Sequence, residues 1–146
     1  MDYKLEPATI DNLDLLIKYK LKNVFAYAKD LKQEEINRIN KYVKVNVPRQ
    51  IKNYKLIMNN DKIIGCILVE KYLDGFLLDE IYIEKEYRNK KIGTELIKGI
   101  QTKYSPVYLW VYKQNIRAYN LYKRLGFEIQ QETETRYFMK YLNLHS

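Results

Sequence analysis

Apolar residues recur every three or four positions in the first third of the chain, which is the spacing of an amphipathic helix. A first helix is predicted behind Thr9, which suits the N-cap position, and its apolar face comprises Ile10, Leu13, Leu16, Ile17, Leu21 and Val24. Asp30 and Gln33 resemble a capping box and precede a second helix, which presents Ile36, Ile39 and Val43. Pro48 cannot continue a helix interior, so this second helix is predicted to end at the segment VNVPRQ.

The middle of the chain carries short apolar runs with turn residues between them, which is typical of antiparallel strands. Residues 54–58, 63–72 and 76–84 are predicted to form a three-stranded meander, joined by the turns NNDK and Asp74-Gly75. A further short strand is expected at residues 3–6.

The last third of the chain alternates helix and strand patterns. Residues 92–104 predict a helix that Ser105 and Pro106 end, and residues 115–125 predict another helix, with Gly126 at its C′ position. VYLWVY, at residues 107–112, is apolar on both faces, which indicates a central buried strand, and two final strands are expected near residues 127–132 and 135–142. This order predicts one α/β domain over residues 1–146, a mixed, mostly antiparallel sheet of about six to seven strands flanked by about four helices.

The amino-acid composition limits which catalytic and metal-binding groups the chain can use. The chain has 146 residues, of which 47% are apolar, enough for a core, and it shows neither a membrane-spanning run nor a secretory signal pattern. We therefore expect a soluble, cytoplasmic protein with no membrane partner. Cys66 and His145 are the only residues of their kinds, which argues against an intrachain disulfide, a cysteine-rich metal site, a histidine-based zinc site and a histidine base. Catalysis would then depend on carboxylates, tyrosines, lysines or backbone groups.

The formal net charge of +8 would suit a nucleic acid, an anionic lipid or another polyanion. Most lysines are scattered over every segment, but one basic cluster stands out in RNKKIGT, residues 88–94, between a predicted strand and a predicted helix. Backbone N–H groups at a helix start bind anions, Gly93 permits close approach of a ligand, and Thr94 adds a hydroxyl. The segment fits neither a Walker A loop nor the pattern G-x-G-x-x-G.

A second motif lies downstream and comprises Asn115, Ala118, Tyr122, Gly126 and Phe127. Its spacing, N-x-x-A-x-x-x-Y-x-x-x-G-F, resembles a pattern of the GNAT superfamily of acyl-CoA-dependent N-acetyltransferases. The family's other pattern, [QR]-x-x-G-x-[GA], matches at Arg88 and Gly93, and the resemblance spans nearly the whole chain. Lys91 departs from the pattern [QR]-x-x-G-x-[GA], because the family usually has glycine at this position. We expect a helical φ that tolerates the side chain, and a lysine that adds charge to the site.

The resemblance implies acetyl-CoA as cosubstrate, with no metal. It places the diphosphate at residues 88–94 and pairs the pantetheine arm with the preceding strand, where backbone N–H groups would stabilise the developing oxyanion. Asn115 would contact the pantetheine amides, although it can also cap its own helix. The cosubstrate-binding residues expected on this basis are Ile81, Ile83, Arg88, Asn89, Lys90, Lys91, Ile92, Gly93, Thr94, Asn115 and Tyr122.

Acetyl transfer needs a base, because an amine with a pKa near 10.4 is almost wholly protonated at pH 7. Asp79 and Glu80 precede the basic segment and point to opposite faces of their strand. The resemblance favours Asp79 as the base, with Glu80 as the alternative, and ordinary strand-end charges are the simplest interpretation of both. The resemblance also makes Tyr122 the general acid for the departing thiolate, since an ordinary phenol with a pKa near 10 is protonated at neutral pH. A core tyrosine is the simpler alternative for Tyr122.

The acceptor amine has no motif of its own. Residues 23–49 and the final hairpin are expected to shape its site, and a small-molecule amine, a peptide N-terminus and a protein lysine all fit. The positive charge of the chain disfavours a highly cationic acceptor. A homodimer is compatible with the resemblance, although no sequence feature establishes it.

Two other functions compete with acetyl transfer. One is a non-catalytic acyl-CoA sensor on the same fold, which the tyrosine and the carboxylates disfavour. The other is a nucleic-acid-binding module, which the lack of an RNP-like motif, a zinc site and a basic helical stripe disfavours. No nucleic-acid partner is expected.

Overall fold

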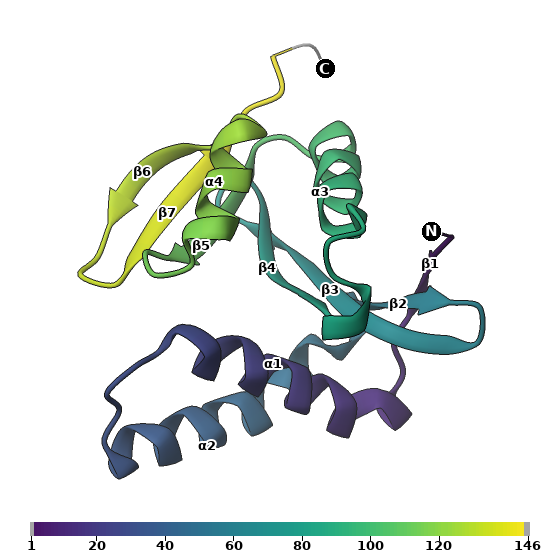
Figure 1. Ribbon diagram of the computed structural model, residues 1–146, viewed down its shortest axis with the longest axis vertical. Helices are drawn as coiled ribbons and strands as arrows, with labels where there is room; N and C mark the ends of the chain where they lie inside the picture. The colour runs from purple at the N-terminus through teal and green to yellow at the C-terminus, as the bar shows by residue number, and fades with distance from the viewer. Residues whose placement is uncertain (1, 145–146) are drawn as a thin grey trace. The chain divides into compact units, whose positions relative to one another are not determined.

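The structure, a computed structural model, describes residues 2–144, and His145 lies outside the described residues. Within that range the chain forms seven strands, four α-helices and three 3-10 turns (Figure 1). None of these helices has the length and apolar character needed to cross a membrane. The elements are β1 (Lys4–Pro7), η1 (Ile10–Asn12), α1 (Leu13–Tyr27), α2 (Gln33–Gln50), η2 (Ile51–Asn53), β2 (Tyr54–Asn59), β3 (Lys62–Tyr72), β4 (Gly75–Ile83), η3 (Lys85–Tyr87), α3 (Ile92–Lys103), β5 (Val107–Tyr112), α4 (Ile116–Arg124), β6 (Glu128–Glu132) and β7 (Arg136–Tyr141).

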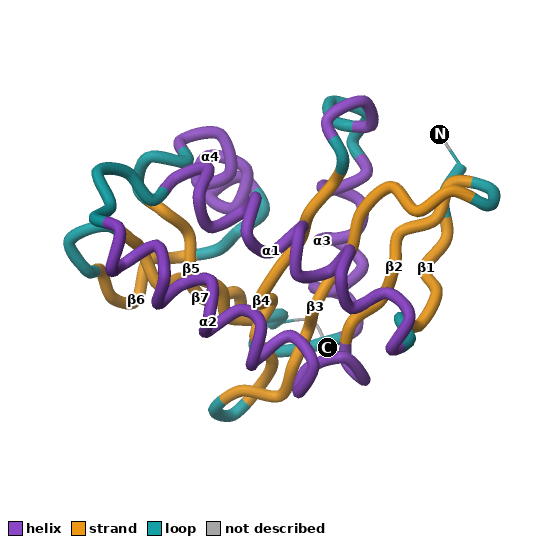
Figure 2. The backbone as a smooth tube through the Cα atoms, turned by 90° about the horizontal axis from the view of Figure 1, so that it is seen from below, coloured by secondary structure: helices purple, strands orange, loops and turns teal. Residues whose placement is uncertain are grey.

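The strands form one sheet in the order β1-β2-β3-β4-β5-β7-β6. β1 and β2, neighbours at one edge (Figure 2), run antiparallel, as do β2 with β3, β5 with β7, and β6 with β7. β4 pairs with β5 in parallel, with Phe76 opposite Val107 and Leu77 opposite Tyr108. The prediction of a mixed, mostly antiparallel sheet with four helices is therefore confirmed.

The described residues pack into two compact units. The first contains the chain up to Leu68 together with Glu80–Tyr87, and the second contains Val69–Asp79 together with the chain from Arg88 onward. β3 and β4 therefore contribute to both units. The single domain over residues 1–146 stays a prediction.

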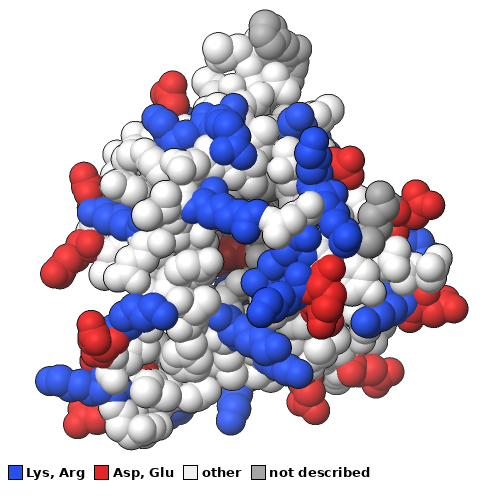
Figure 3. Space-filling model, in the orientation of Figure 1, with Lys and Arg blue, Asp and Glu red and all other residues white. Residues whose placement is uncertain are grey.

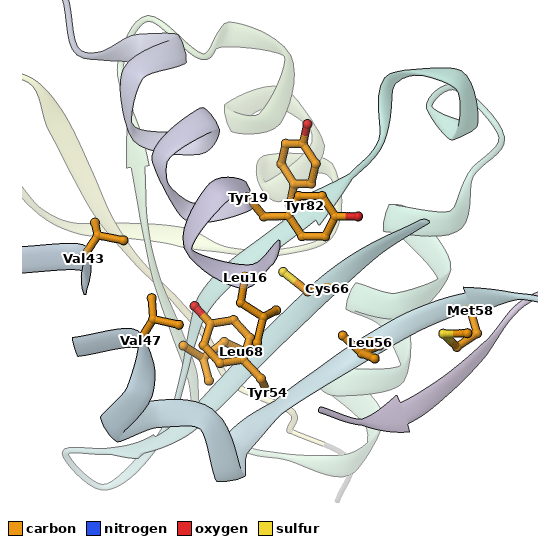
Figure 4. Packing of buried hydrophobic residues seen from close by; sticks show 10 residues of the cluster. All are labelled: Leu16, Tyr19, Val43, Val47, Tyr54, Leu56, Met58, Cys66, Leu68 and Tyr82. Carbon is orange, nitrogen blue, oxygen red and sulfur yellow. The ribbon is translucent and has the colours of Figure 1, made fainter. Parts of the chain in front are cut away.

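The core of the first unit lies between the two N-terminal helices and the strands β2 and β3. α1 and α2 lie side by side (Figure 1), and each turns apolar residues spaced three or four apart toward the strands. Tyr19 stacks on Tyr82 of β4, with ring centroids 4.5 Å apart. The cluster, drawn in Figure 4, comprises Leu16, Tyr19, Val43, Val47, Tyr54, Leu56, Met58, Cys66, Leu68 and Tyr82.

The second unit is built around β5 and β7. Their antiparallel register sets Val107, Leu109 and Val111 beside Tyr141, Met139 and Tyr137 on one face. α4 packs on this face, since the ring of Tyr119 lies 5.0 Å from that of Tyr137. Gln101 of α3 donates a hydrogen bond of 2.7 Å to the carbonyl of Leu125, just past α4. The predicted central strand and the two predicted helices of this region are confirmed.

The second helix ends at Gln50, the last residue of the predicted segment VNVPRQ, but the expected break at Pro48 is wrong. α2 continues through Pro48 to Gln50, and the N–H of Ile51 still bonds to the carbonyl of Pro48. A proline removes only one helical hydrogen bond, the one to the carbonyl four residues earlier. That carbonyl belongs to Lys44, which is exposed to water, while Val47 is 1% exposed and anchors the last turn in the core. Tertiary packing therefore outweighs the missing bond.

The starts of the first two helices also differ in detail from the predictions. Thr9 is the N-cap of η1, as predicted, but this turn leads into α1 through Asn12, whose side chain accepts a hydrogen bond of 2.8 Å from the Thr9 N–H. The capping box expected at Asp30 and Gln33 is wrong, because Asp30 has a left-handed φ of 56°. Lys32 caps α2 instead, and Glu35 accepts its N–H at 3.2 Å.

Candidate functional site

The basic segment at residues 88–94 forms the loop between η3 and α3 and the first turn of α3. Asn89 and Lys91 in this loop have left-handed backbones, with φ of 63° and 66°. Lys91 is the N-cap of α3 and has a ψ of 11°, so the expected helical φ at Lys91 is wrong. The chain enters the helix directly from a tight loop, which requires a conformation that glycine adopts without strain. Lys91 therefore has a glycine-like backbone and retains a charged side chain.

The start of α3 leaves backbone donors without acceptors. Its first hydrogen bond runs from the N–H of Glu95 to the carbonyl of Lys91, at 3.0 Å. A lysine side chain has no acceptor, and accordingly Lys91 makes no side-chain cap. Among residues 2–144, the N–H groups of Ile92, Gly93 and Thr94 have no hydrogen-bond acceptor. Orphan donors of this kind, at the positive end of a helix dipole, are suited to binding an anion.

Positive side chains surround this helix start. Arg88, Lys90 and Lys91 are exposed in the loop, as are Lys98 and Lys103 along α3. Figure 3 shows blue side chains gathered over the part of the molecular face where α3 and its preceding loop lie. Ile92, 2% exposed, anchors the first turn in the core, so the loop has a fixed support. This part of the structure therefore combines backbone donors on a buried anchor with exposed positive charges.

α4 carries the second predicted motif. The Asn115 side chain accepts the N–H of Ala118 at 3.2 Å, so its capping role is confirmed. Gly126 has a φ of 96°, as expected for a residue at C′. Tyr122 is 9% exposed, its ring lies 5.7 Å from that of Phe127 in an edge-on arrangement, and its carbonyl accepts the N–H of Phe127 at 3.0 Å. Tyr122 is thus held by a capped helix at one end and by a glycine turn at the other.

Glu80 is a buried carboxylate in the first unit, not a strand-end charge at the surface. It is 5% exposed, and the hydroxyl of Tyr54 donates to its Oε1 at 2.6 Å. The thiol of Cys66 donates to its Oε2 at 3.6 Å. The Nζ of Lys20, on α1, lies 3.8 Å from Oε1 and balances the charge. Both oxygens of Glu80 are therefore engaged.

The pKa values of two other side chains in the first unit, Cys66 and Tyr19, are also shifted. Burial, together with the neighbouring Glu80, raises the pKa of the Cys66 thiol well above its ordinary value, so the thiol stays protonated. Burial and a hydrogen bond to Glu84 raise the pKa of Tyr19. Both groups are therefore neutral donors at physiological pH.

Several residues of this polar cluster could not be singled out from the sequence. Lys20, Tyr54 and Glu84 belong to no motif. Only the fold brings Lys20 and Tyr54 to Glu80, and Glu84 to Tyr19. A weak signal existed on α1, where Tyr19 and Asn23 are four residues apart and thus share a helical face. Asn23 uses that position to donate to the carbonyl of Ile81 at 3.3 Å.

The predicted site residues are distributed over both units. Glu80, Ile81 and Ile83 lie on the part of β4 that belongs to the first unit. The second unit contains the half-buried Asp79, the loop and first turn at residues 88–94, Asn115 and Tyr122. Among residues 2–144, no group of three or more histidine, cysteine, aspartate or glutamate side chains is arranged to hold a metal ion.

Comparisons with known proteins identify relatives of this chain. A curated relative, a probable spermine N(1)-acetyltransferase of Bacillus subtilis subsp. natto, is 32% identical over 63 residues. That match covers 39% of this chain and only 41% of the relative's length.

Solved structures share the fold over nearly the whole chain. The PaiA N-acetyltransferase of Thermoplasma acidophilum, solved in complex with coenzyme A, has a TM-score of 0.76 at 22% identity, covering 98% of this chain and 100% of the other. The apo form of YjaB from Escherichia coli has a TM-score of 0.76 at 18% identity, covering 97% and 98%.

A match to a sequence family shows which family the chain belongs to. The family described as "Acetyltransferase (GNAT) domain" matches residues 52–129. This region runs from η2 to β6, and it includes the loop before α3 and all of α4. The match extends over more than half of the chain, and the resemblance inferred from the sequence is thereby confirmed. The chain belongs to the GNAT family of N-acetyltransferases.

Proposed function

We propose that the protein transfers the acetyl group of acetyl-CoA to a primary amine, which attacks the thioester directly. The observation that supports this most strongly is the start of α3, where the N–H groups of Ile92, Gly93 and Thr94 lack acceptors beside the exposed Lys90 and Lys91. The diphosphate of coenzyme A would supply the oxygen acceptors, so the residues present fit the group. Bound acetyl-CoA would supply an activated acyl carbon and a thiolate leaving group.

Two segments of the chain are each proposed to bind one part of acetyl-CoA. Backbone amides from Asn89 to Thr94 would hold the diphosphate, and the side chains of Arg88, Lys90 and Lys91 would add charge. Backbone groups of Ile81 and Ile83 would pair with the pantetheine arm as an added strand does. An N–H of this strand would stabilise the charge that develops on the carbonyl oxygen.

A carboxylate would accept the proton of the amine, and we assign this role to Asp79. This choice follows the family resemblance, and Glu80, which accepts hydrogen bonds from Tyr54 and Cys66 and lies beside Lys20, is the alternative. A base must offer a lone pair to the incoming proton. Asp79 is half-buried, and it would act directly or through one water molecule.

Tyr122 would protonate the departing sulfur. Its helix is fixed by the Asn115 cap and by the turn at Gly126, so the phenol would be held ready to donate. The amide nitrogen of Asn115 would remain available to the pantetheine arm, since only its oxygen is used by the cap. In the complete reaction the ammonium form of the acceptor first loses one proton to solvent, and the neutral amine then forms the N–C bond while the C–S bond breaks. The carboxylate takes the second proton from the nitrogen, and Tyr122 gives its proton to the sulfur. The carboxylic acid then loses its proton to solvent, and the Tyr122 phenolate takes one up, which restores both groups.

The proposal is tested by measuring the release of free coenzyme A from acetyl-CoA with a panel of primary amines. We expect turnover with at least one amine, and we expect Tyr122→Phe to lower it by about 100-fold or more while leaving acetyl-CoA binding in place. Tyr119→Phe is the matched control, because Tyr119 lies on the same helix and packs on Tyr137. Binding of acetyl-CoA without turnover on any amine would identify a sensor instead, and unchanged turnover in Tyr122→Phe would remove this residue from the mechanism.

A further inference from the structure

The face of β5 and β7 opposite α4 carries a continuous set of aromatic rings. Tyr108 stacks on Phe138 with ring centroids 5.4 Å apart and planes 2° apart, and Trp110 lies 4.7 Å from the same Phe138. Tyr72 of β3 extends the set, with its centroid 5.9 Å from Tyr108. We call Tyr72, Tyr108, Trp110 and Phe138 the ring ladder. All four belong to the second unit.

Strand register sets which residues share this face. Trp110 pairs with Phe138, and Tyr112 pairs with Arg136, so alternation brings Arg136 to the side of the ring ladder. The intervening Tyr137 points to the other side, where it contacts Tyr119 of α4. The ring ladder and the helix that carries the proposed general acid therefore lie on opposite faces of the same strands.

Two cations lie over the ring ladder. The guanidinium of Arg136 is 4.6 Å from the Trp110 centroid, and the ammonium of Lys140 is 5.7 Å from the Tyr108 centroid. A guanidinium has five N–H donors, and a contact with a ring face does not consume them. Within residues 2–144, no carboxylate and no hydrogen-bond acceptor engages the Arg136 guanidinium. Its fork of donors is positioned by Trp110 and lacks an anionic partner.

We propose that the ring ladder and Arg136 bind the acceptor, and that the acceptor is a primary amine carrying a carboxylate and an apolar or aromatic group, as in an amino acid or a short peptide. The carboxylate would pair with the fork of Arg136, and the apolar group would lie against the half-buried Tyr72 and Trp110, because Tyr108 and Phe138 are buried beneath them. Arg136, which has no anionic partner, would repel a polyamine, whereas the Asp74 carboxylate lies near Lys140. This inference rests on the proposed function, and it names the acceptor class for that reaction.

The test uses Trp110, the only tryptophan in the chain, as a fluorescent reporter of binding. The wild-type protein is titrated, without acetyl-CoA, with phenylalanine, leucine and the dipeptide Phe-Gly, each compared with its C-terminal amide, and with spermidine. We expect at least one acid to change the fluorescence saturably, with at least tenfold tighter binding than its amide, and we expect no saturable change with spermidine. The proposal is overturned if no acid binds more tightly than its amide, or if spermidine binds more tightly than every acid.

Variants at Arg136 locate the contact. Arg136→Gln should abolish the preference for acids, and Arg136→Lys should keep part of it, because the charge remains but the fork is lost. Arg117→Gln, on the exposed side of α4, should bind as the wild type does, and circular dichroism checks that all three variants fold. An unchanged preference in a folded Arg136→Gln variant would also overturn the proposal. Because acetyl-CoA is omitted, binding of acids by a protein that acetylates no amine would refute the proposed activity alone.

Discussion

Replacement of Lys91 by glycine should stabilise the fold without tightening the binding of acetyl-CoA. Lys91 has a φ of 66° and a ψ of 11°, and a left-handed backbone costs an L-residue about 1–2 kcal/mol. Glycine avoids this strain but loses more backbone freedom on folding, a cost of about 0.5–1 kcal/mol. The net gain in the free energy of unfolding should be about 0.5–1 kcal/mol, which corresponds to about 2 °C in Tm for a chain of this length.

The affinity for acetyl-CoA should fall in the same variant. Lys91→Gly removes one positive charge next to the orphan N–H groups, so acetyl-CoA should bind more weakly, and the salt dependence of its affinity should become shallower. Urea unfolding followed by circular dichroism measures the stability, and calorimetry at two salt concentrations measures the affinity.

Lys90→Gly is the matched control for this pair of effects. Lys90 is also exposed in the loop, but it is not among the residues with positive φ. It should therefore lose charge without any relief of strain, and become less stable. The reasoning about strain is refuted if Lys91→Gly is no more stable than Lys90→Gly. The reasoning about charge is refuted if Lys91→Gly binds acetyl-CoA more tightly than the wild type.

Three further predictions concern polar groups. The hydrogen bond from Tyr108 lowers the pKa of Asp74, so its stabilisation is present above the ordinary aspartate pKa of about 3.9 and is lost as the pH falls through the lowered value. Asp74→Asn should therefore be less stable than the wild type in urea at pH 7, and the gap should narrow as the pH falls below the ordinary aspartate value. Cys66, whose pKa is raised by burial, should resist iodoacetamide at pH 8 and react once urea unfolds the chain, as mass spectrometry would show. Tyr54→Phe should lower the free energy of unfolding by about 1–3 kcal/mol, because Glu80 loses a buried donor; an unchanged urea midpoint would contradict this.

Elements whose local pattern agrees with their environment could be predicted from the sequence. VYLWVY matches β5 at both ends, because a strand buried on two faces is apolar throughout. The helix from Asn115 to Gly126 also follows from local chemistry, since its cap and its C′ glycine are sequence features. Local signals of this kind also identified the family.

The features that could not be predicted depend on contacts between distant segments. Pro48 stays within α2 because Val47 is buried in the core, which no local rule reveals. The left-handed φ of Lys91 comes from the geometry of the loop, and a lysine gives no signal for it. Glu80 looks like a surface charge in the sequence, but it is buried because Tyr54 and Lys20 meet it across the fold.

The central claim is that backbone N–H groups at the start of α3 bind the diphosphate of acetyl-CoA. Amide chemical shifts in a ¹H–¹⁵N NMR titration with acetyl-CoA test it most directly. The chain has five glycines, whose amide signals are readily resolved, so Gly93 can be compared with Gly65, Gly75, Gly99 and Gly126 in one experiment. The account predicts a saturable shift that is largest for Gly93 and its neighbours Ile92 and Thr94. It is contradicted if acetyl-CoA moves no amide, or if it moves other glycines and leaves Gly93 in place.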